Sequence, residues 1–141
     1  MANIIPFSFR GALFQGQHDF ANSGGNTFKL SLYVGGGSFP YTTASTVYSA
    51  TDEVSSGGGS NYAVKTLTNN GVASSTAVAS VDFANVTWSS ATFSAAYAAI
   101  YNSDTVDSVA NRLVVVLDFG GSKTATNGDF TITFPDPTTP A

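Results

Sequence analysis

The chain has 141 residues, a net charge of −4 and no cysteine. This length suits a single domain with a sizeable core. The lack of cysteine excludes disulfides, thiolate metal sites and a cysteine nucleophile, and the acidic balance disfavours nucleic acid or an anionic membrane as a partner.

Charged residues make up only 10% of the chain, against about 25% in typical domains. Ser and Thr together supply 35 residues, so hydroxyls and amides must form most of the polar surface. Such a surface resists association less well than a charged one. The composition therefore favours a protein that packs against neighbours, although a halotolerant or secreted β domain would look similar.

The first 27 residues mix large apolar side chains with Gly and Asn. They predict an N-terminal arm docked on a neighbour, or a first strand. They do not resemble a secretory signal, and no apolar run has the length of a membrane span. We therefore expect a soluble product of a cytoplasm that reaches any later location by assembly rather than by export.

The segment 28–34, "FKLSLYV", alternates apolar and polar residues between two glycine clusters. This period of two predicts a half-buried strand. Residues 35–60 are rich in Gly, Ser and Thr and predict a long loop, tethered to the body by Tyr41, Val47, Tyr48 and Val54. Its three glycines at 57–59 indicate a flexible connector, because no helical pattern follows them as a phosphate loop requires.

From residue 62 onward, turn clusters separate five short segments that predict strands. These segments are "YAVKTLT", "TAVASVDFA", "ATFSAAYAAIYN", "RLVVVLDFG" and "DFTITF". The last two predict a hairpin over 111–135. Its first strand is apolar on both faces, so we expect another strand or a sister subunit to cover the second face.

The predicted fold is all-β, an antiparallel β-sandwich of about seven to eight short strands with long Gly/Ser-rich loops and extended terminal arms. The predicted divisions are 1–27 for the N-terminal arm or first strand, 28–135 for the β-sandwich domain, and 136–141 for an extended Pro-rich tail.

Groups that could perform catalysis are few. His18 is the only histidine and precedes Asp19, but no nucleophile elbow is present, and we expect a hydrogen-bonded or solvated turn residue. Asp118 is expected to accept turn hydrogen bonds at a strand end, or to pair with Lys123 or Arg112.

The remaining acidic and aromatic residues suggest similar interpretations. Glu53, the only glutamate, stands beside Asp52, and no second acid pairs with it in the manner of a glycosidase. Asp104 and Asp107 predict a solvated acidic turn rather than calcium ligands. The aromatic residues predict core or interface anchors more than a sugar-stacking platform; they are Tyr33, Tyr41, Tyr48, Tyr62, Tyr97, Tyr101 and Trp88. We therefore predict no catalytic, cofactor-binding or metal-binding residue.

Several segments over 17–135 occur in a characteristic order, and the most specific of them are "TFKLSLY", "AIYN" and "LDFGGSKTATNGDFTITFP". These segments and their order resemble a family of small virion structural proteins of tailed bacteriophages, which are assembled in the host cytoplasm. It implies a non-enzymatic building block of the virion without cofactors. We expect a homo-oligomeric capsid decoration (cement) protein that binds the major capsid protein or other virion proteins.

Two alternative functions remain open. The same fold could serve in the tail or tail tip, as a structural or receptor-contacting part. A carbohydrate-binding module is the alternative from another class.

Overall fold

The computed structural model describes residues 2–74 and 77–135. The chain is mostly β, with antiparallel sheets and one short helix, as the sequence predicts. The elements are α1 (Phe7–Phe14), β1 (Phe28–Tyr33), β2 (Lys65–Thr66), β3 (Asn69–Ser74), β4 (Ala79–Phe83), β5 (Val86–Asn102) and β6 (Arg112–Ile132). The predicted tail at 136–141 lies outside the described residues.

The main sheet has the strand order β2-β1-β5-β6. Strand β1 matches its predicted position, but it is buried on both faces rather than one. Leu30 and Leu32 belong to the main core, whereas Tyr33 packs with Tyr41 on the opposite face. The loop 35–60 therefore covers the face that alternation assigns to solvent.

Strands β5 and β6 form one long, bent ribbon, and the predicted hairpin at 111–135 is wrong. Strand β6 runs unbroken through the predicted turn, and its pairing with β5 extends from Val86↔Ile132 to Asn102↔Arg112. Register shifts interrupt this pairing at four places, and Gly120, Gly121 and Asn127 adopt positive φ. Residues that tolerate positive φ serve bulges as well as turns, so here they bend the ribbon instead of reversing the chain.

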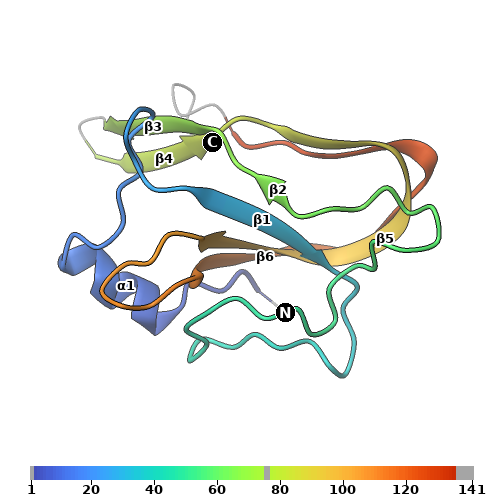
Figure 1. The fold of residues 1–141 in the computed structure, drawn as a ribbon, viewed down its shortest axis with the longest axis horizontal. Coiled ribbons are helices and arrows are strands. Elements are labelled where there is room, and N and C mark those ends of the chain that lie inside the picture. Colours follow the sequence, from blue (N-terminus) through green and yellow to red (C-terminus); the bar gives the residue numbers. More distant parts are fainter. Residues whose placement is uncertain (1, 75–76, 136–141) are drawn as a thin grey trace.

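The bend folds one half of the β5–β6 ribbon over its other half and over β1. Figure 1 shows β5 and β6 curling back at one end of the molecule, so that their two halves lie one above the other with β1 beside the lower half. The main core fills the space between them and includes Phe28, Leu30, Trp88 and Phe130. Trp88 is 1% exposed, and its indole N–H donates to the Ala63 carbonyl at 2.8 Å.

Strands β3 and β4 form a separate two-stranded sheet, here called the β3–β4 hairpin. The sequence predicts a turn cluster between "YAVKTLT" and "TAVASVDFA", but the residues directly after "YAVKTLT" begin β3. The Asn69 side-chain amide donates to the carbonyls of Ala21 and Asn26, at 3.2 and 3.1 Å. These bonds fix the base of the hairpin, while Val72, Val78 and Val81 remain exposed.

The N-terminal segment contains a helix where the sequence predicts an arm or a strand. Ile4 pairs with Val116 as an isolated antiparallel bridge, and α1 follows directly after Pro6. Gly16, with φ of 65°, lies just beyond the helix end, as a left-handed residue commonly does. A helix of eight residues is marginal by itself, so packing against the rest of the chain must stabilise α1.

The second face of β6 is covered within the chain. Leu113 and Val116 cluster there with Ile4 and Tyr41, and the Leu113 N–H donates to the Thr46 carbonyl at 3.0 Å. The two-sided apolar pattern of this strand thus reflects burial by the chain's own N-terminus and long loop, and no sister subunit is needed to explain it.

Candidate functional site

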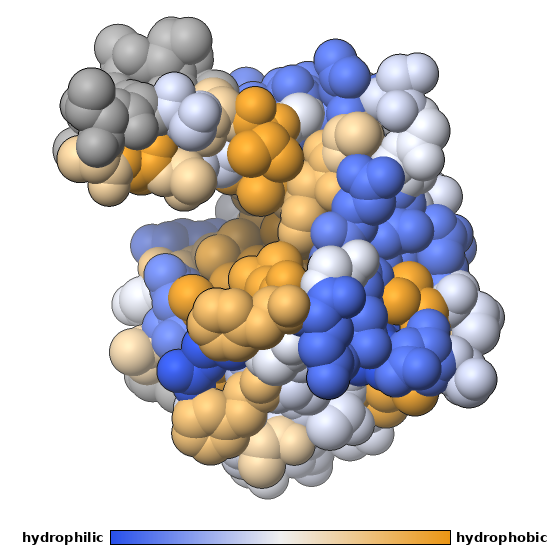
Figure 2. All heavy atoms as spheres, turned by 90° about the vertical axis from the view of Figure 1, so that its left-hand side faces the viewer, coloured by the Kyte–Doolittle hydropathy of each residue, from blue (hydrophilic) through white to orange (hydrophobic). Residues whose placement is uncertain are grey.

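An apolar groove lies between helix α1 and the β3–β4 hairpin. Its volume is about 790 Å³. Figure 2 shows the face on which it opens, where hydrophobic residues line a deep notch beneath an overhanging lobe.

Three parts of the chain build this groove. The hairpin contributes Val72 and Val81, which lie opposite each other in the β3–β4 register. The N-terminal segment contributes residues four apart in the chain, Ile5, Phe9 and Leu13. The ribbon and the chain that follows it supply the remaining apolar lining, which includes Ile100, Val114, Val115, Leu117, Ile132 and Phe134.

The lining contains no charged side chain among the described residues, and Thr133 is its one hydroxyl-bearing residue. Burying a charge in such a place is costly unless the charge is paired. The groove can therefore hold an apolar side chain or another uncharged group. It offers no group suited to acid–base chemistry.

Large hydrophobic residues are concentrated around this groove. The described part of the chain exposes nine of them, and seven lie on β3–β4, on α1 or next to these elements: Ile5, Phe7, Leu13, Phe14, Val72, Val78 and Val81. Phe14 is 94% exposed. Four of these residues, Ile5, Leu13, Val72 and Val81, also line the groove, and a large exposed apolar patch marks an interaction site in soluble proteins.

His18 holds the segment after α1 against the ribbon. Its ring is buried beside Phe9, with centroids 5.1 Å apart, and the Asn102 side-chain amide donates to its Nδ1 at 3.1 Å. Its Nε2 is buried and has no hydrogen-bond partner among the described residues. Burial, together with the positive charge of Arg112, lowers the pKa of His18 below its ordinary value of 6.5.

The expectation that His18 is a hydrogen-bonded residue is confirmed, but the ring is buried rather than solvated. Asp19, its neighbour in sequence, does not serve as its orienting carboxylate. Instead, Asp19 Oδ1 accepts a hydrogen bond from the Ala21 N–H at 2.9 Å.

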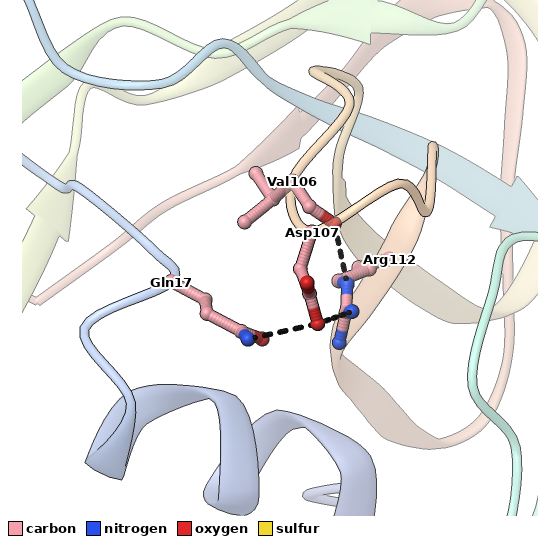
Figure 3. A network of polar contacts seen from close by, with 4 residues as sticks. All are labelled: Gln17, Val106, Asp107 and Arg112. Atoms are coloured by element: carbon pink, nitrogen blue, oxygen red, sulfur yellow. Dashed lines mark hydrogen bonds and ion pairs between the residues drawn. The ribbon is translucent and has the colours of Figure 1, made fainter.

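The acidic turn at 103–111 forms specific contacts. Figure 3 shows Asp107 between Gln17 and Arg112: Gln17 donates to its Oδ2 at 3.1 Å, and the Arg112 guanidinium lies 3.6 Å from the same oxygen. Asp104 accepts a hydrogen bond from the Thr27 N–H at 2.9 Å. These carboxylates fasten the segment after α1 to the ribbon. Nowhere in the described ranges do three or more potential metal ligands gather.

The second acidic centre joins the long loop to the body. Glu53 accepts hydrogen bonds from the hydroxyls of Tyr48 and Tyr62, the latter at 2.7 Å. The Leu32 N–H of β1 donates to the Tyr62 hydroxyl at 3.0 Å. Burial is the main cause that raises the pKa of both tyrosines, and their bonds to Glu53 raise it further.

The aromatic residues are mostly core and loop anchors. Tyr33, Tyr41, Tyr62, Tyr101 and Trp88 are buried, and Tyr48 stacks on Tyr101 with centroids 4.5 Å apart. The predicted tethers of the long loop are confirmed for Tyr41 and Val54, which are buried, whereas Val47 is exposed and contributes a backbone bridge to Arg112. A sugar-stacking platform needs exposed rings, and these residues do not supply one.

Asp118 accepts a local backbone hydrogen bond, as predicted, but it lies inside the unbroken strand β6 rather than at a strand end beside a turn. The Gly120 N–H donates to its Oδ1 at 2.8 Å. This bond is the largest cause that lowers the pKa of the Asp118 carboxyl.

A comparison of the chain with protein-family models, curated proteins and solved structures finds no significant match. Within the described ranges, no helix combines the length and the hydropathy needed to cross a membrane.

Sequence reasoning missed the groove because it missed α1. The signal was present: Ile5, Phe9 and Leu13 recur every four residues, which is the spacing of one helix face. The β3–β4 hairpin, which forms the other wall of the groove, could not be placed from local sequence spacing. Its position depends on contacts such as that between Asn69 and Ala21, which are 48 residues apart.

Proposed function

We propose that the protein is a non-enzymatic structural component of a tailed-bacteriophage particle, and that it decorates the outer surface of the capsid as a homo-oligomer. The sequence resemblance over 17–135 supports the assignment of the protein to a phage particle. The apolar groove with its exposed rim supports the mode of action, because such a surface is suited to being covered by other proteins. This groove is the observation that carries the proposal.

We further interpret the curled ribbon and β1 as the two layers of a β-sandwich. Loops and the N-terminal segment then surround a well-packed body, while the apolar contact surface is confined to one end. A body of this kind can attach to many equivalent positions of a protein shell. Attachment through several linked copies gains from effective concentration, so each single contact can be modest.

The location on the particle is tested by imaging. Phage particles are labelled with an antibody against the protein and viewed by electron microscopy. We expect label distributed over the capsid surface. Label on the tail or tail tip would support a tail component instead, and particles without label would contradict a virion role.

The cement role is tested by removing the protein. Capsids stripped of it should lose integrity at lower temperature and in low salt, and adding back the purified protein should restore their resistance. Stripped capsids with unchanged resistance would contradict this role.

A further inference from the structure

We propose that the apolar groove receives helix α1 of a second copy of this chain, with the Phe14 ring as the anchor. The inference rests on the homo-oligomeric part of the proposed function and names the surfaces that would form the contact.

The first argument is the pairing of a projecting ring with a hollow on the same side of the protein. Phe14, at the C-terminal end of α1, has almost its whole surface in water. Its neighbour Leu13 lines the groove. The ring and one wall of the hollow thus belong to the same helix, so that two copies can each offer a ring and a groove in one reciprocal contact, as a two-fold interface requires.

The second argument is charge. The groove has no charged lining residue in the described part of the chain, and α1 carries a single charge, that of Arg10, which lies over the Phe7 ring at 4.6 Å. The whole chain has a net charge of −4. The uncharged Phe14 ring suits this lining, and the positive charge of the exposed Arg10 does not add to the repulsion between two acidic chains.

The third argument is area. The seven exposed hydrophobic residues on and beside α1 and the β3–β4 hairpin together present several hundred Å² to water, because an aromatic side chain offers about 150–250 Å² and an aliphatic one less. A stable interface of ordinary size buries about 800 Å² on each partner. The patch is thus large enough to account for most of one side of such an interface.

The β3–β4 hairpin gives a further reason for a partner. An isolated two-stranded hairpin is marginally stable in water, and this one exposes Val72 and Val81 on its groove face. A helix from a second copy in the groove would bury both valines. The contact would therefore stabilise the hairpin as well as the oligomer.

The first experiment measures self-association of the full-length protein by analytical ultracentrifugation over a range of concentrations. We expect the wild-type chain to associate, and Phe14→Ser to weaken association at least about tenfold, as loss of a central aromatic anchor does. Val72→Lys should also weaken it, because it places a charge in the groove. The matched control is Val34→Lys, since Val34 is 45% exposed but lies outside the groove lining.

The second experiment uses the absence of cysteine from the natural chain. Gln15→Cys, which keeps the Phe14 anchor next to it, and Val81→Cys are made in separate chains, mixed and oxidised. We expect a mixed disulfide-linked dimer on a non-reducing gel, and much less of it when Val34→Cys replaces Val81→Cys. Equal yields from both mixtures would contradict the proposed contact.

Two results would overturn the inference. Capsid binding, measured independently, tests the proposed function. A wild-type chain that stays monomeric at all concentrations excludes a second copy as the occupant. If the monomer nevertheless binds capsids and Val72→Lys abolishes that binding, the groove serves a virion partner instead. Association that persists unchanged in both Phe14→Ser and Val72→Lys would place the self-contact elsewhere.

Discussion

His18 and Asn102 are hydrogen-bonded side chain to side chain across 84 residues of sequence, with 3.1 Å between Nδ1 and Nδ2. The bond joins the segment after α1 to the end of β5. Because an amide nitrogen can only donate, His18 Nδ1 is the acceptor. The neutral ring therefore carries its proton on the buried Nε2.

This relationship predicts the effect of acid. The pKa of His18 is lowered in the folded protein, so at pH values just below 6.5 the unfolded chain binds a proton that the folded chain does not. Stability should therefore be constant above pH 6.5 with respect to this group and should fall as the pH decreases through 6.5. His18 is the only histidine, so NMR of its ring protons measures the midpoint directly.

We expect this midpoint to lie below 6.5 and the acid-induced loss of stability to be smaller in His18→Gln. A midpoint at or above 6.5 in the folded protein would show that the ring is not buried as described.

The tyrosines predict a corresponding loss of stability in alkali. Burial, the largest cause, raises the pKa of Tyr101 to about 12 and also raises the pKa values of Tyr33 and Tyr62. Above pH 10 the unfolded chain loses tyrosine protons that the folded chain keeps, so stability should fall as the pH rises through 10. Absorbance of tyrosinate should then appear with the loss of the folded circular dichroism signal, and tyrosinate formation well before unfolding would contradict this.

Glu53 is predicted to stabilise the attachment of the long loop. Glu53→Ala leaves the hydroxyls of Tyr48 and Tyr62 without their shared acceptor, and hydrogen bonds to a charged group contribute about 1.5–3 kcal/mol each. Since the site is half-buried, we expect a loss of about 2 kcal/mol in urea unfolding. Glu53→Gln keeps one acceptor and should cost less, so equal losses in the two variants would argue against this role.

Gly35 is predicted not to tolerate a side chain. Its φ is 82°, and an added Cβ would lie 2.7 Å from Cε2 of Tyr97 and 2.9 Å from Cβ of Ala96. Gly35→Ala should therefore lower the free energy of unfolding by about 2 kcal/mol or more.

The matched control is the next residue. Gly36 has no positive φ and no atom within 4 Å of an added Cβ. Gly36→Ala should change stability by no more than about 0.5 kcal/mol. Thermal or urea unfolding compares the two variants, and similar losses would contradict the close approach of Gly35 to Tyr97.

The β class and the position of β1 could be predicted from sequence because they depend on local alternation. The turns could not be predicted in the same way. The residues at 120–128 have the composition of a turn, yet they continue β6, because β5 supplies a partner strand along the whole length. Whether a Gly-rich stretch bends or reverses the chain is decided by that partner, which lies some 30 residues earlier (Ser94 pairs with Thr124).

The candidate site was less accessible to prediction than the fold. The tethering residues of the long loop and the hydrogen-bonded state of Asp118 follow from residue type and neighbours. The groove follows from the docking of α1 and the β3–β4 hairpin, which no local pattern specifies. His18 shows the difference: its type predicts a hydrogen bond, but its burial depends on Phe9 and on Asn102.

The continuous pairing of β5 with β6 also determines the order in which the fold can assemble. The two strands are joined by the short connection 103–111. Their pairing can therefore begin beside this connection and extend residue by residue toward the far ends, with a small loss of loop-closure entropy at each step. Strand β1 is synthesised well before β5. It can therefore form its hydrogen bonds to β5, its principal neighbour in the sheet, only after β5 has been made.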